Sequence, residues 1–149
     1  MKAVPESLET WLKYFAQAVR DRDFDAGKKL FFAGSISFGT VCQRSENLDE
    51  LITNQWQIVW PNTRDFDFEY DSARAIVTET TATVITGWQS TGFDREQIPQ
   101  QRQGRATIVF QKYAGNWLAI HSHFSINPTF IHDPVIWHGT ASRSDRQLL

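Results

Sequence analysis

The feature of this sequence that most constrains its fold is a change in apolar spacing just after residue 62. Before that point, apolar side chains recur every three or four residues, which is the period of an amphipathic helix. After it, they alternate with polar or small residues, which is the period of a β-strand. Helices followed by a meander of strands predict the α+β class, with the helices packed on one side of an antiparallel sheet.

Three helices are expected in the first part of the chain. The apolar stripe of the first helix consists of Leu8, Trp11, Leu12, Phe15 and Val19. The second is a short helix over 23–31, which its glycine weakens. The third begins near Asn47, where Glu50 is placed for a capping box, and it ends at Pro61.

Strands are expected at 35–41, 65–71, 73–77, 80–88, 105–112 and 116–125. Strand 65–71 carries aromatic side chains on one face and four carboxylates on the other, as an edge strand with a solvated side does. The polar stretch 92–103 predicts a long loop. Because the strands carry apolar residues on both faces, we expect one face to cover the helices and the outer face to form a homodimer.

The length of 149 residues fits a single domain, expected over 1–128. Residues 129–149 are expected to be an extension that docks in part and frays at its end. The chain contains eleven Phe, six Trp and three Tyr, enough for a large core and an aromatic-lined pocket.

Charge and composition exclude several classes of partner. A formal net charge of −2 gives no electrostatic footprint for nucleic acid or for an anionic membrane. No apolar run resembles a signal peptide or a membrane span, so the cytoplasm is the expected compartment. Cys42 is the only cysteine, which excludes an intrachain disulfide. No cofactor-binding motif is present, and no cofactor is expected.

The segment 104–125, GRATIVFQKYAGNWLAIHSHFS, resembles the closing hairpin of SnoaL-like proteins of the nuclear-transport-factor-2-like superfamily. It is also similar to the association domain of calcium/calmodulin-dependent protein kinase II, whose final strand has a comparable Trp, two alternate His and a Ser. The order of elements extends the resemblance over roughly 7–128. The resemblance implies a cone-shaped, strongly curved antiparallel sheet with three N-terminal helices packed on its concave side.

His121 and His123 are the first candidate site. They are expected on one face of the last strand, together with Trp117 and Ser125. Beside Arg105 they would form an acid/base pair, or hold a metal ion if a third ligand were present. No third ligand is placed near them, so no metal site is expected. The structural alternative is a hydrogen-bonded network that supports the sheet or a dimer contact.

The resemblance also implies where a pocket would lie. The kinase association domain has pocket-lining arginines at positions that correspond here to Trp88, Ile108 and Phe124. The loss of these charges implies an apolar, aromatic pocket for a hydrophobic or planar ligand and not for a small anion. Trp56 and Trp60, on one side of the third helix, would either pack in the core or form pocket walls. The expected lining is therefore Trp56, Trp60, Trp88, Ile108, Ser122 and Phe124.

Two hypotheses for function remain open. The first is a SnoaL-like module of unassigned activity that binds a small hydrophobic ligand or serves in assembly. The alternative is an acid/base enzyme of the isomerase, cyclase or dehydratase type, acting on a hydrophobic molecule with His121 or His123 as the proton carrier. The steroid isomerases of this fold use carboxylates in an apolar pocket, and few carboxylates fall on the inner strands here, which favours the first hypothesis.

Overall fold

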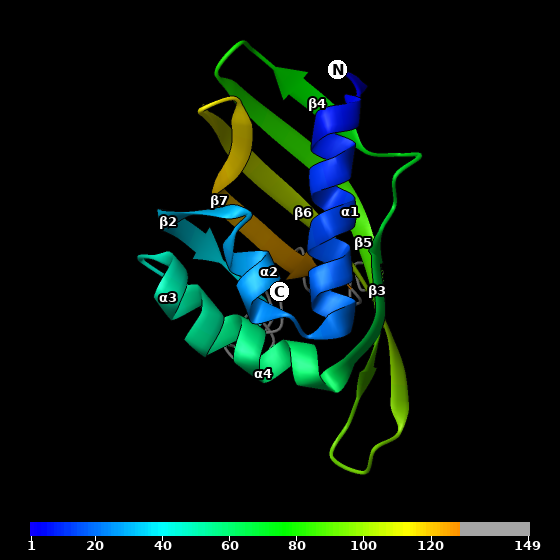
Figure 1. Ribbon diagram of the computed structural model, residues 1–149. Helices are drawn as coiled ribbons and strands as arrows, with labels where there is room; N and C mark the ends of the chain where they lie inside the picture. Colours follow the sequence, from blue (N-terminus) through cyan, green and yellow to red (C-terminus); the bar gives the residue numbers. More distant parts are fainter. Residues whose placement is uncertain (129–149) are drawn as a thin grey trace, which may run out of the picture.

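The computed structural model describes residues 1–128, in which helices pack against one face of a curved seven-stranded sheet (Figure 1). The helical elements are α1 (Glu6–Asp21), α2 (Phe24–Lys28), α3 (Leu48–Leu51), η1 (Ile52–Trp56), α4 (Gln57–Val59) and η2 (Trp60–Asn62). The strands are β1 (Lys2–Ala3), β2 (Phe31–Phe38), β3 (Thr63–Phe68), β4 (Arg74–Val77), β5 (Thr81–Phe93), β6 (Pro99–Tyr113) and β7 (Asn116–Ile126). The predicted α+β class and curved sheet are confirmed.

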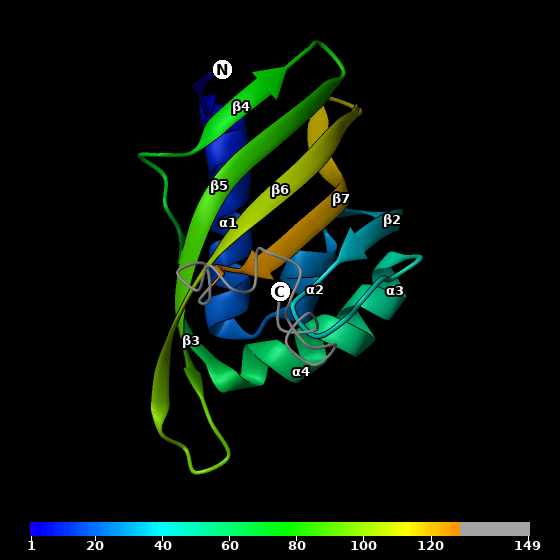
Figure 2. The same ribbon diagram turned by 180° about the vertical axis from the view of Figure 1, so that it is seen from behind.

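The strand order is β1-β4-β5-β6-β7-β2, and β3 pairs with β5 beyond the end of β4. All pairings are antiparallel except that of β2 with β7, which is parallel. Figure 2, from behind, shows the strands running diagonally with α1 on their far side. None of the helices within residues 1–128 is long and apolar enough to cross a membrane.

The third predicted helix is a continuous helical run over 48–62, and its start follows the expected capping pattern. The Asn47 side chain accepts a hydrogen bond from the backbone N–H of Glu50 at 2.9 Å. The Glu50 carboxylate reaches back to the N–H of Glu46 at 2.8 Å. The sequence did not predict that the middle of the run, η1, is a π-helix.

The predicted loop over 92–103 is wrong, because both strands of this hairpin continue past the core. β5 runs to Phe93 and β6 begins at Pro99. The remaining turn is held by the carboxylate of Asp94, which accepts hydrogen bonds from the N–H groups of Glu96 and Ile98 at 2.8 and 2.9 Å. Most residues of this hairpin arm are exposed, so the arm needs no apolar alternation, and its polar sequence predicts a loop instead.

The expected common face of Trp117, His121 and His123 is also wrong, because β7 contains a bulge. Val109 pairs with His121, but the next residue, Phe110, pairs with Ala119, which leaves one extra residue in β7. A bulge inverts the alternation of side chains on either side of it. The Trp117 indole therefore reaches Ser7 of α1 on the helical side, whereas the histidines face the other way. The expectations for 129–149 lie outside the described residues.

Candidate ligand-binding cavity

A cavity of about 70 Å³ lies between the helices and the inner face of the sheet. Seven of its lining residues are aromatic, namely Phe15, Phe38, Trp56, Trp60, Phe66, Trp88 and Phe124. The partly exposed side chains of Thr40 and Arg102 and the exposed Ile126 also line it, so the cavity is open to solvent on one side. Such a lining suits a flat apolar molecule that enters from this side.

Trp56 and Trp60 form the helical wall of the cavity. Their rings stack with centroids 4.6 Å apart and an interplanar angle of 17°. Phe24 of α2 stacks on Trp60 at 5.2 Å. A Cβ atom at Gly27 would lie only 2.8 Å from Cη2 of Trp60 and 3.0 Å from Cζ3 of Trp56, so α2 approaches the pair this closely because residue 27 has no side chain. The indole stack is therefore fixed from the outside by α2.

The π-helix η1 places Gln55 and Trp56 side by side in the cavity lining. Single π-turns within α-helices occur frequently at functional sites. The Gln55 side chain accepts hydrogen bonds from the N–H groups of Val41 and Cys42, both at 2.9 Å, and donates to the Thr40 hydroxyl at 2.8 Å. One side chain thus holds the loop after β2 against the cavity.

The sheet contributes Trp88 and Ser122 to the opposite wall. Trp88 lies across Gly104, its partner on β6, where a Cβ atom would collide with the indole. The indole Nε1–H donates to the carbonyl of Arg105 at 3.2 Å. Ser122 is buried, and its hydroxyl lies 3.0 Å from the Ser37 hydroxyl, which joins β7 to β2 below the cavity.

Arg102 is the only charged residue among the cavity-lining residues of 1–128, and no carboxylate, histidine or lysine accompanies it. Its guanidinium lies over Gly92, where any Cβ atom would collide with it. No salt bridge or side-chain hydrogen bond within residues 1–128 uses this guanidinium. Arg102 cannot be recognised as a cavity residue from the sequence, because the polar segment 92–103 around it predicts a loop.

Five of the six residues expected to line a pocket surround this cavity, namely Trp56, Trp60, Trp88, Ser122 and Phe124. The sixth, Ile108, does not, because it is fully buried in the hydrophobic core.

His121 and His123 lie on the outer face of the sheet, opposite the cavity. His121 Nδ1 lies 2.6 Å from the carbonyl oxygen of Ile36, and the Phe38 ring packs edge-on against both imidazoles at 5.3 Å. Arg105 is exposed and donates to the Ser125 hydroxyl at 3.2 Å. Within the described part of the chain, no group of three or more His, Cys, Asp or Glu side chains is placed to hold a metal ion.

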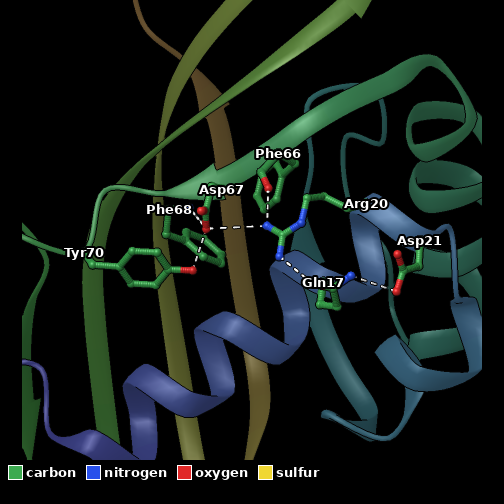
Figure 3. Close-up of polar contacts among 7 residues, drawn as sticks. All are labelled: Gln17, Arg20, Asp21, Phe66, Asp67, Phe68 and Tyr70. Atoms are coloured by element: carbon green, nitrogen blue, oxygen red, sulfur yellow. Dashed lines mark hydrogen bonds and ion pairs between the residues drawn. The ribbon is translucent and has the colours of Figure 1, made fainter.

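Outside the cavity, a cluster of polar side chains formed by Arg20, Asp67 and Tyr70 joins α1 to β3 (Figure 3). Arg20 donates to the carbonyl of Phe66 at 2.8 Å and lies 3.7 Å from the carboxylate of Asp67. Asp67 accepts a hydrogen bond from the Tyr70 hydroxyl at 2.5 Å. Burial raises the pKa of the Tyr70 phenol, and the hydrogen bond to Asp67 raises it further. The cluster fixes β3, whose Phe66 faces the cavity.

A curved sheet that cradles α1 and encloses an aromatic cavity is the nuclear-transport-factor-2-like fold. Within that class, the model of the SnoaL-like domain matches residues 8–129, and the chain belongs to this family. Comparison with curated proteins gave no significant match.

Solved structures with this fold are similar to the chain at low identity. A nuclear transport factor 2-like protein from Salmonella enterica superposes with a TM-score of 0.71 at 16% identity, over 85% of this chain and 93% of that one. A ketosteroid isomerase-like protein from Erwinia carotovora gives 0.70 at 15%, over 80% and 93%. The association domain of calcium/calmodulin-dependent protein kinase II from C. elegans gives 0.58 at 18%, over 79% and 88%. These similarities establish the fold alone.

Proposed function

We propose that the protein is a binding module for one small, flat, hydrophobic molecule, held in the aromatic cavity. The observation that carries this proposal is the lining itself: seven aromatic residues and, within 1–128, no side chain that exchanges protons near neutral pH. Aromatic faces bind planar apolar ligands by dispersion and stacking. The acid/base alternative, with His121 or His123 as proton carrier, receives no support from this cavity because both histidines lie across the sheet from it.

The size of the cavity limits the ligand. Its 70 Å³ is smaller than the roughly 150 Å³ that admits benzene in an engineered protein cavity, and far below the roughly 300 Å³ or more of drug-sized pockets. A ligand of one ring would therefore require a small outward shift of the lining and would leave its substituent projecting through the open side. Polycyclic ligands are excluded unless the walls move much further.

A cavity-filling variant tests the proposal. Val59 lines the cavity from the helical run, and its neighbour Ile58 is exposed and does not line it. In Val59→Phe the added ring would occupy the cavity, whereas Ile58→Phe adds the same kind of ring to the surface. We expect toluene, an apolar molecule of one ring, to raise the thermal midpoint of the wild type and of Ile58→Phe, but not that of Val59→Phe. Equal shifts in all three proteins would refute the assignment of the cavity.

We also propose that two copies of the chain pair through the outer face of the sheet. One row of paired residues on this face runs Ile76, Thr83, Val109 and His121, and the adjacent row runs Arg74, Ile85, Thr107 and His123. Ile76 and Ile85 are 54% and 41% exposed within residues 1–128. Exposed apolar residues gathered on a sheet face are typical of an interface.

A further inference from the structure

The only charged side chain that lines the cavity within residues 1–128 is Arg102, and its position is unusual for a surface arginine. It belongs to β6, directly opposite Ser90 of β5, and both residues line the cavity. The absence of a side chain at Gly92 provides the space that the guanidinium occupies. The guanidinium therefore lies over Gly92, beside a cavity walled by aromatic rings.

A guanidinium in such surroundings favours an anion. It is partly withdrawn from water, and the nearby lining offers it no carboxylate. Its planar fork of N–H donors matches the two oxygens of a carboxylate, and such charge-assisted pairs are stronger than neutral hydrogen bonds. Ser90 is buried beside it and adds a neutral hydroxyl donor. One cation and one hydroxyl match a singly charged group better than a doubly charged phosphate.

We propose that the ligand is a small aromatic monocarboxylic acid, whose ring lies against the tryptophan walls and whose carboxylate pairs with Arg102 at the open side of the cavity. This inference rests on the proposed binding function and specifies the class of ligand. The positions of the lining residues support this assignment, because Trp56, Trp60 and Trp88 are buried whereas Arg102 is partly exposed. The ring of the ligand would therefore enter first, and its acid group would remain at the entrance.

The test compares acids with their neutral amides. Isothermal titration calorimetry at neutral pH would measure the binding of phenylacetate and phenylacetamide, and of trans-cinnamate and trans-cinnamamide, to the full 149-residue chain. The variants are Arg102→Gln and, as the control, Arg95→Gln, which removes the same charge from the exposed tip of the same hairpin. Circular dichroism and thermal midpoints would establish that both variants are folded.

We expect the wild type and Arg95→Gln to bind each acid more tightly than its amide. Arg102→Gln should weaken the acids by about tenfold to a hundredfold, the usual range for losing a hydrogen bond to a charged group. The amides should bind wild type and Arg102→Gln alike. Arg102→Lys should recover only part of the loss, because an ammonium lacks the planar fork.

Other outcomes separate the two proposals. If acids and amides bind the wild type equally, or if Arg102→Gln binds the acids as the wild type does, the acid assignment is overturned and the hydrophobic binding function stands. If neither acids nor amides nor toluene bind, both proposals are overturned. A loss of acid binding in Arg95→Gln as large as that in Arg102→Gln would attribute the effect to net charge and would also overturn the assignment.

Discussion

Individual polar side chains in this protein act mainly by fixing the cavity walls. Gln55 is the clearest case, because all of its hydrogen-bonding contacts are to the loop after β2. The carbonyl oxygen of its side chain accepts hydrogen bonds from two backbone N–H groups. A buried N–H without an acceptor lowers the stability of the folded state. Gly39 leaves the space that the amide occupies, since a Cβ atom there would collide with it.

Replacing Gln55 with Leu should destabilise the protein by about 2–3 kcal/mol, because the N–H of Cys42 would remain buried without an acceptor. Gln57→Leu is the matched control, since Gln57 lies two residues further along the helical run and is exposed. It should change the free energy of unfolding by less than about 0.5 kcal/mol. Urea denaturation measures both. Equal effects would mean that the loop is held by other contacts.

Tyr70 predicts a pH dependence of stability. The folded state raises the pKa of its phenol above the value of about 10 found in an unfolded chain. Its contribution to stability is therefore complete below pH 10 and declines as the pH rises from there toward the higher folded pKa. Tyr70→Phe should cost about 0.5–1 kcal/mol at neutral pH, since the hydrogen bond to Asp67 is only partly buried.

As the pH rises from about 10 to about 11, the wild type should lose more stability than Tyr70→Phe, so that the two proteins approach each other. Urea unfolding at several pH values provides the comparison, and parallel pH profiles would contradict it. The two proteins differ only at residue 70, so the difference between their pH profiles isolates Tyr70.

Two of the departures from ideal geometry in this fold determine which side chains reach the cavity. The π-turn η1 sets Gln55 and Trp56 in the lining, and the bulge in β7 brings Ser122 and Phe124 inward while turning the histidines outward. Each adds one residue to an otherwise regular repeat. Apolar spacing shows that an element exists, but a single added residue does not break the pattern enough to be detected from sequence.

The contact of α2 with the helical run gives a test at the level of elements. Gly27→Ala would place a methyl group against Trp56 and Trp60, and overpacking of this kind costs about 1–3 kcal/mol. The gain in helix propensity of about 1 kcal/mol offsets part of this cost. We therefore expect a net destabilisation of about 1 kcal/mol, together with a change in tryptophan fluorescence.

Gly34→Ala is the control for Gly27→Ala. Its new methyl group would meet the ring of Phe32, which is exposed and stacks on Tyr113, away from the tryptophan pair. Its stability should stay within about 0.5 kcal/mol of the wild type, and its tryptophan fluorescence should not change. Identical emission spectra for wild type and Gly27→Ala would show that α2 does not fix the indole stack.

For the molecule as a whole, the sequence predicted the fold better than the site. The helical and alternating apolar patterns depend on burial, which the whole fold determines, so the α+β class and most elements were predictable. Which residues line the cavity depends on the three-dimensional arrangement of the elements, which apolar spacing does not reveal. Ile108 was assigned to the pocket because it corresponds to a pocket arginine of the kinase association domain, whereas its side chain is fully buried in the hydrophobic core. Arg102 belongs to a polar segment without apolar alternation, which forms a strand only because it pairs with β5.

The proposed dimer makes a prediction at the same scale. Ile85→Lys would place a charge on the outer face, opposite Thr107 and close to His123, and should shift the protein from dimer to monomer. Ile58→Lys is the control, because Ile58 is equally apolar and exposed but lies on the helical run. Sedimentation equilibrium of the wild type and both variants measures the change. A monomeric wild type, or a dimeric Ile85→Lys, would contradict the proposed interface.

The parallel pairing of β2 with β7 has a consequence for the order of folding. It joins segments 85 residues apart, as the Ser37–Ser122 contact shows, whereas β5, β6 and β7 follow one another through short hairpins. Contacts between distant segments form slowly, because loop closure costs entropy before any contact is gained. The hairpins should therefore form first, and the wall that contains Ser122 should close last. A ligand in this cavity would then bind only chains that have finished folding, and its occupancy would measure how many have done so.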